Sequence, residues 1–172
     1  FIREEAETAV REGSTFLVLS DKNISNQKAS IPSILTVGAV HSHLINHGLR
    51  GYCSLNIECA DAMDTHSFAI LIGVGATTVN PYLAIDSIYQ RFEKKLFGKS
   101  DFEICVSKFK KSINAGLLKI MSKMGISVIS SYRGGCNFEA VGLSRAIVSD
   151  YFPGMSSRIS GIGIIGIEKK IK

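Results

Sequence analysis

The chain is poor in proline and has no long apolar run, and both absences limit what it is. It contains three prolines in 172 residues. No stretch of about 20 consecutive apolar residues occurs, so we expect no membrane-spanning helix and no membrane partner. The first ten residues, FIREEAETAV, are charged and amphipathic and do not form a signal peptide. Because the chain starts without methionine, inside a predicted helix, we expect it to be a piece of a longer protein.

Metal-binding cysteine patterns are also missing. The four cysteines, Cys53, Cys59, Cys105 and Cys136, form no CxxC pair. Five residues separate the first two, a spacing that can begin an iron–sulfur ligand series, but no third cysteine follows nearby. Strand-like residues flank both, so we interpret them as small buried thiols. Free thiols of this kind favour a reducing, cytosolic compartment.

The motifs of common catalytic sites are incomplete. His43 and His47 are four residues apart and can share a helix face as zinc ligands do, but the glutamate of an HExxH motif is absent. No GxSxG elbow occurs. The GVGAT segment at 73–77 lacks the third glycine of a dinucleotide fingerprint, so we interpret it as a tight helix-to-strand connection. We therefore predict no catalytic, cofactor-binding or metal-binding residue, and a surface or packing role for the histidines.

Charge does not indicate a nucleic-acid partner. The formal net charge is +5, but the lysines are dispersed, and the densest cluster, at 108–111, is typical of a solvated helix face. Aromatic residues do not alternate with these lysines as a base-stacking platform requires. The length and the 45% hydrophobic content fit one compact domain.

Strand-like and helix-like segments alternate along the chain. Short apolar runs predict strands at 15–19, 52–58, 76–79 and 126–130. Apolar residues at helical spacing predict the intervening helices, including two long ones at 82–96 and 102–124. This alternation predicts an α/β fold with a mostly parallel sheet and crossover helices. The sheet is either an incomplete (β/α)-barrel-like or a Rossmann-like one, because four strands are too few for a barrel of about 250 residues.

Polar residues follow each predicted strand. Asp21 and Glu58 come at the ends of the first two strands, and Asn80 follows the third. Tyr132 and Arg133 follow the fourth and lead into two consecutive glycines. Parallel α/β sheets usually hold their ligands at the carboxyl ends of the strands. These five residues are therefore the candidate rim residues.

Several segments together carry a family resemblance. They are VREGSTFLVLSDK, IPSILTVGAVHSHLINHGLR, GVGATTVNPYLA, GLLKIMSKMGISVISSYRGGCNFEAVGLS and YFPGMSSRISGIG. In this order, and over nearly the whole chain, they resemble the central domain of the large chain of glutamate synthase. The resemblance implies that residues 1–153 are the carboxyl-terminal part of this connecting domain. Residues 154–172 then form an extended, flexible, glycine-rich exit toward an FMN domain.

The resemblance also implies a function and partners. In that family an amidotransferase domain releases ammonia from glutamine, and an FMN domain with a three-iron cluster uses it to convert 2-oxoglutarate to glutamate. The central domain joins the two, helps to form the ammonia path and carries no FMN. The expected partners are these two domains and either a small reductase subunit or ferredoxin. The expected location is the cytoplasm, or a plastid in a photosynthetic eukaryote.

The sequence departs from the family pattern at polar positions. Ser67 stands where the family tends to have the second of two histidines, and Val74 changes its GYGA turn to GVGA. Gly135 and Cys136 change its RGAQ elbow to RGGC. Such changes favour a scaffold over chemistry by these side chains. Tyr132 and Arg133 are then better candidates for a domain interface than for substrate contact.

A second interpretation does not depend on the resemblance. A free-standing small α/β module could bind an anionic ligand at a rim formed by Asp21, Glu58, Asn80 and Arg133. Glycine-rich turns at the carboxyl ends of strands are suited to this role.

Overall fold

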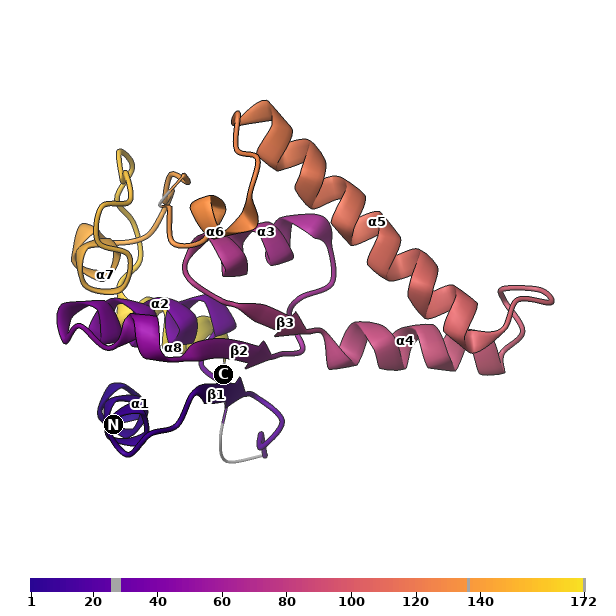
Figure 1. The fold of residues 1–172 in the computed structure, drawn as a ribbon, viewed down its shortest axis with the longest axis horizontal. Helices are drawn as coiled ribbons and strands as arrows, with labels where there is room; N and C mark the ends of the chain where they lie inside the picture. The colour runs from indigo at the N-terminus through magenta and orange to yellow at the C-terminus, as the bar shows by residue number, and fades with distance from the viewer. Residues whose placement is uncertain (26–28, 136, 172) are drawn as a thin grey trace.

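Three parallel strands form one sheet, and helices pack against it (Figure 1). The computed structural model describes residues 1–25, 29–135 and 137–171. In the sheet, β1 (Phe16–Ser20) pairs with β2 (Ser54–Glu58), and β2 pairs with β3 (Thr78–Asn80). The register aligns the last residues of the strands, so all three end at one edge. The predicted α/β fold with a parallel sheet and crossover helices is confirmed.

Helices make up most of the remaining regular structure. In chain order they are α1 (Ile2–Arg11), α2 (Ser33–Asn46), α3 (Thr65–Gly73), α4 (Tyr82–Glu93), α5 (Phe102–Lys123), α6 (Ile129–Tyr132), α7 (Arg145–Tyr151) and α8 (Ile164–Ile171). A 3₁₀ turn, η1 (Arg50–Tyr52), precedes β2. The long α5 runs from the end of α4 back toward α6 (Figure 1). The two long helices predicted between the third and fourth strands are therefore present.

The sheet grows in one direction, and this determines which face is covered. α2 connects β1 to β2, and α3 connects β2 to β3. Crossovers between parallel strands are almost always right-handed, so two crossovers in one direction place both helices on the same face. α2 and α3 do contact each other. The described sheet is open, and its strand order β1-β2-β3 contains no reversal of the kind that marks a ligand site in Rossmann-like sheets.

Side chains alternate between a covered and an open face of the sheet. Leu17, Leu55 and Ile57 point toward the helices and are buried in the main core. Phe16 and Val18 point to the other face and are 72% and 65% exposed. Among the described residues, that face has no helix layer over its β1 side.

The strand predicted at 126–130 is wrong. Residues 126–128 form a link without a ladder partner among the described strands, and α6 begins at Ile129. Ile126 packs instead against a second apolar cluster that includes Met121 of α5 and residues of α3. The β-branched residues of the segment 126–130 favour extended backbone, but a strand also needs a neighbouring strand to pair with. Only Ile126 of this segment is partly buried by that packing, and Val128 and Ile129 remain 52% and 39% exposed.

The carboxyl-terminal segment is not wholly extended, contrary to the expectation for 154–172. Ile164, Ile167 and Ile171 recur at helical spacing within α8, and Ile167 packs against the main core. The preceding residues form an isolated bridge between Leu143 and Ile162. The glycine content of this segment favours extended backbone, whereas its isoleucine spacing favours the helix that forms.

Tyr132 anchors α6 to α3. Its side chain has 0% exposure, and its hydroxyl donates a hydrogen bond to the carbonyl of Ala69 at 3.1 Å. The ring meets Phe138 edge-on, with 6.2 Å between centroids. Burial raises the pKa of Tyr132. The residue therefore forms a buried structural link.

We predict that Tyr132→Phe lowers the free energy of unfolding by about 1 kcal/mol, the usual net contribution of one buried hydrogen bond. Denaturant unfolding followed by circular dichroism measures this change. The matched control is Tyr89→Phe, because Tyr89 is 49% exposed and should shift stability by less than about 0.5 kcal/mol. Equal stability of the two variants would show that the hydroxyl of Tyr132 does not anchor α6.

Candidate functional site

Polar side chains converge where the three strands end. We call the residues Ser20, Asp21, Lys22, Glu58 and Asn80 the carboxyl rim. Glu58 lies at its centre: one carboxylate oxygen accepts from the Ser20 hydroxyl at 2.8 Å. The other accepts from the Lys22 ammonium at 2.7 Å and from the Asn80 amide at 3.1 Å. The structure thus brings together the three rim residues predicted from the first three strands.

Hydrogen bonds satisfy the Glu58 carboxylate, whereas Asp21 Oδ1 is buried without a hydrogen-bond partner among the described residues. Hydrogen bonds from Lys22 and then Ser20 hold the pKa of Glu58 below its usual value. The Asp21 carboxylate accepts the Ala60 N–H at 2.9 Å. Burial and the adjacent Asp21 raise the pKa of Tyr82 to about 12. With two carboxylates and one ammonium, the rim is suited to hydrogen-bond donors or cations and poorly suited to an anion.

Arg133 lies away from this rim, at the opposite edge of the sheet. Arg50 marks that edge, because its guanidinium donates to the carbonyls of Cys53 and Gly75, which come just before β2 and β3. Arg133 is close enough for its positive charge to lower the pKa of Arg50, adding to the larger effect of burial. The Nε atom of Arg133 is buried without a hydrogen-bond partner among the described residues. The structure therefore separates Arg133 from Asp21, Glu58 and Asn80.

His41 links the amino edge of the sheet to the glycine elbow. Its Nδ1 accepts from Arg50 Nε at 3.0 Å, and burial, followed by the charges of Arg50 and Arg133, lowers the pKa of His41 to about 4. A Cβ atom on Gly75 would lie 2.3 Å from His41 Cγ, and one on Gly134 would lie 2.9 Å from its Nε2. The neutral ring thus fits against two glycines, and the GVGAT segment is the tight connection that the sequence predicts.

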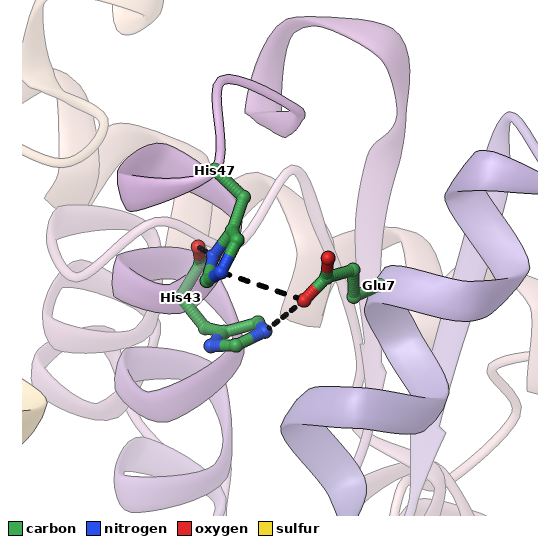
Figure 2. Close-up of side chains that lie close together, drawn as sticks. All are labelled: Glu7, His43 and His47. Atoms are coloured by element: carbon green, nitrogen blue, oxygen red, sulfur yellow. Dashed lines mark hydrogen bonds and ion pairs between the residues drawn. The ribbon is translucent and has the colours of Figure 1, made fainter.

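Glu7 is a polar residue that the sequence reasoning missed. It lies on α1, and its carboxylate reaches His43 and His47 on α2 (Figure 2). The spacing of the two histidines is visible in the sequence, but the third member is 36 residues from His43. The amphipathic pattern of α1 predicts a helix without indicating which helix it packs against. Within the described part of the chain, this trio is the group of three whose metal-ligand atoms converge.

The cysteines do not form a cluster site in the described structure. Cys53 and Cys59 are buried, as predicted, and Cys105 is buried as well. Burial, with Asp61 nearby, raises the pKa of Cys59 to about 12, so its thiol stays protonated. Cys136 lies outside the described residues. The described cysteines therefore do not fit an iron–sulfur cluster.

None of the described helices is long and apolar enough to cross a membrane.

The fold and the rim together define a class of protein: an α/β domain with a one-sided parallel sheet and a polar carboxyl edge. Residues 1–144 match the family model for the glutamate synthase central domain. The match spans most of the chain, and the chain belongs to this family. The resemblance noted in the sequence is therefore confirmed.

Known relatives support this assignment and show how much of them the chain covers. The chain is 59% identical to the glutamate synthase [NADPH] large chain of Azospirillum brasilense, over 99% of the chain and 11% of that protein. It is 43% identical to the ferredoxin-dependent glutamate synthase of Pyropia yezoensis, over 97% of the chain and 12% of that protein. It is 44% identical to the chloroplastic ferredoxin-dependent glutamate synthase of Spinacia oleracea, over 92% of the chain and 10% of that protein. The chain therefore spans about a tenth of the length of these relatives.

We predict that Glu58→Gln removes a stabilising contribution that depends on pH. The folded pKa of Glu58 is lowered, so this contribution is present at neutral pH and is lost as the pH falls through that lowered pKa. Denaturant unfolding of both proteins across a pH series should show a difference at neutral pH that disappears in acid. Glu93→Gln, an exposed position at the end of α4, is the control and should show no such trend. A difference that persists in acid would contradict the role of the carboxylate charge.

Proposed function

We propose that this chain is the central connecting region of a glutamate synthase large chain. In this role it joins an amidotransferase domain to an FMN domain, helps to shape the path of ammonia between them, and performs no chemistry alone. The observation that carries the proposal is the open face of the sheet in a chain whose relatives are about ten times longer. FMN and the iron–sulfur cluster belong, in this proposal, to the neighbouring parts of the enzyme.

The open face has the character of a surface that another part of the protein covers. Parallel sheets are almost always covered on both faces, because their crossover connections supply helices to each side or their strands close into a barrel. Here Phe16 and Val18 are largely exposed on that face. Across the register from Val18 lie Asn56 and then Thr78, and the Thr78 hydroxyl donates to the Asn56 amide oxygen at 2.6 Å. This mixture of apolar and hydrogen-bonded groups suits contact between domains.

The edges of the sheet support the same proposal. In the described sheet β1 and β3 each pair on one side only, because β2 lies between them. Exposed edges of this kind readily pair with other chains, and proteins usually cover them. Neighbouring segments of a longer chain would cover both the edges and the open face.

Arg133 and Tyr132 are assigned to a domain interface in this proposal. The Arg133 Nε has no hydrogen-bond partner among the described residues, and Arg50 adds a second positive charge close by. A carboxylate or carbonyl from an adjoining domain would complete this arrangement. Tyr132 holds α6 in place from inside. The boundary at 153, with residues 154–172 leading to the FMN domain, is part of the same proposal.

The names of the relatives are the basis for proposing an electron donor and a location. Relatives are named for both NADPH and ferredoxin, and the spinach relative is named chloroplastic. We propose a reductase subunit or ferredoxin as the external partner and a cytoplasmic or plastid location.

We predict that Val18→Lys leaves the stability of the chain nearly unchanged but weakens the coupling between glutamine hydrolysis and glutamate formation. In the 172-residue chain the free energy of unfolding should change by no more than about 0.5 kcal/mol, because Val18 is 65% exposed. In a longer glutamate synthase chain that contains this region, the same lysine would be buried between domains. The glutamate formed per glutamine hydrolysed should therefore fall.

The matched control for this test is Leu118→Lys, on α5, because Leu118 is also 65% exposed. It should leave the ratio of glutamate formed to glutamine hydrolysed unchanged. Equal ratios in the two variants, whether reduced or normal, would contradict a covering domain on the open face.

We further predict that the 172-residue chain binds phosphate, FMN and 2-oxoglutarate no more tightly than about millimolar, or about 4 kcal/mol. The reason is that the carboxyl rim is acidic and Arg133 lies at the other edge of the sheet. Calorimetric titration with each compound measures this. A micromolar affinity for any of them would support the free-standing anion-binding module instead.

A further inference from the structure

Glu7, His43 and His47 form a three-sided cluster between α1 and α2, and we propose that it is a binding site for a transition-metal ion of the zinc class. One ligand-type atom from each residue lies within 4.8 Å of the other two. The two histidines are four residues apart, His43 in the last turn of α2 and His47 as its C-cap residue, and both rings project toward α1 (Figure 2). Two imidazoles and one carboxylate are a donor set that zinc accepts.

The distances within the cluster are near those that a metal requires. A tetrahedral zinc ion with bonds of about 2.0–2.1 Å holds its ligand atoms about 3.3 Å apart. His43 Nε2 lies 2.7 Å from Glu7 Oε2, and His47 Nε2 lies 3.7 Å from the same oxygen. One distance is slightly shorter and the other slightly longer than the metal-bound value. Side-chain rotations that lengthen the first distance and shorten the second would bring both near the metal-bound value.

The tautomer of His47 is set correctly for a ligand, whereas His43 Nε2 carries the hydrogen of its bond to Glu7 and gives that proton up to Nδ1 or to solvent when an ion binds. His47 Nδ1 lies 2.8 Å from the carbonyl oxygen of His43. A carbonyl oxygen only accepts, so Nδ1 carries the hydrogen and Nε2 presents its lone pair toward Glu7. Metal-binding histidines are typically oriented by such a bond from the other ring nitrogen.

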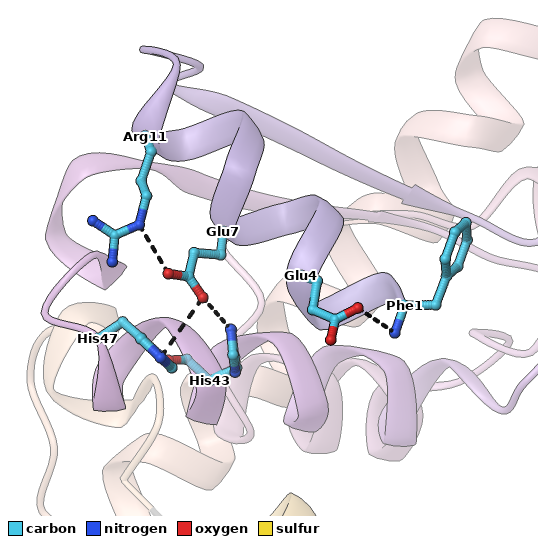
Figure 3. Close-up of polar contacts among 6 residues, drawn as sticks. All are labelled: Phe1, Glu4, Glu7, Arg11, His43 and His47. Carbon is cyan, nitrogen blue, oxygen red and sulfur yellow. Dashed lines mark hydrogen bonds and ion pairs between the residues drawn. The ribbon is translucent and has the colours of Figure 1, made fainter.

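The carboxylate is also held in place from behind. Arg11, one turn along α1, donates from Nε to Glu7 Oε1 at 2.8 Å. Figure 3 shows Arg11 and the two histidines on opposite sides of this carboxylate, so the second oxygen faces the rings. Arg11 thus acts as a positioning residue, because it fixes the orientation of Glu7 without facing the rings.

The cluster is open enough to exchange an ion with solvent. The side chains of Glu7 and His43 are 21% and 18% exposed, and that of His47 is 40% exposed. Three protein ligands leave a fourth position for water. Without metal, the His43–Glu7 hydrogen bond joins α1 to α2; a bound ion would replace that bond and join the same two helices.

The test is titration of the 172-residue chain with ZnCl₂ by calorimetry and with CoCl₂ by visible absorption. We expect one ion per chain and a cobalt spectrum of tetrahedral type without a thiolate charge-transfer band. Each of Glu7→Gln, His43→Gln and His47→Gln should weaken binding at least as much as the roughly tenfold loss seen when an outer partner of a ligand is removed. The matched control is His66→Gln, at an exposed histidine on α3, which should bind normally.

His47→Gln decides the question if another variant fails to fold, because His47 is the most exposed of the three and the His43–Glu7 bond stays in place. Its folding is checked by its thermal unfolding transition. Binding no tighter than millimolar in the unmodified chain would overturn the proposal. So would unchanged affinity in His47→Gln, or a thiolate band, which would place the ion at a cysteine.

Discussion

The one-way growth of the parallel sheet is the constraint on which the rest of this structure depends. β2 lies between β1 and β3, and each crossover moves the chain one strand further in the same direction. Right-handed crossovers then place α2 and α3 together, so a single helical layer and a single core form on one face. α1 joins that layer by packing on α2. Within the described residues, the other face has no such layer over its β1 side, and Phe16 and Val18 are therefore exposed there.

α3 contacts both apolar clusters and so joins α5 and α6 to the main core. Phe68 and Leu71 face the main core, whereas Ala69 and Ile72 face the cluster that holds α5 and α6. Small residues allow this close contact: a Cβ atom on Gly73 would collide with the ring of Phe138. A helix that is apolar on both sides has to be buried on both sides. α5 and α6 therefore dock on α3, whereas α7 packs on α2, and none of them adds a strand to the described sheet.

Much of this arrangement can be predicted from the sequence, and the predictions that are wrong have physical causes. The first three strands and the long helices are marked by periodicity that local chain geometry imposes. The segment 126–130 is the exception: its β-branched residues favour extended backbone, but no described strand lies beside it, and only Ile126 packs against the second apolar cluster. The rim residues Asp21, Glu58 and Asn80 were predictable because parallel strands end at one edge. Arg133 was placed at the rim because a fourth strand was predicted before it, and that strand does not form. The contact of Glu7 with the two histidines depends on the packing of α1 against α2, which no local sequence pattern indicates.

The two edges of the sheet place different chemical demands on whatever meets them. At the carboxyl rim, Glu58 already binds Lys22, and Asp21 adds a second carboxylate, so a neighbour there has to bring donors or positive charge. At the amino edge, Arg50 donates to backbone carbonyls, and Arg133 keeps a buried Nε unmatched within the described residues. A neighbour there has to bring an acceptor. Two domains with opposite surface chemistry can therefore each fit one edge and not the other, which is what the proposed connecting role requires.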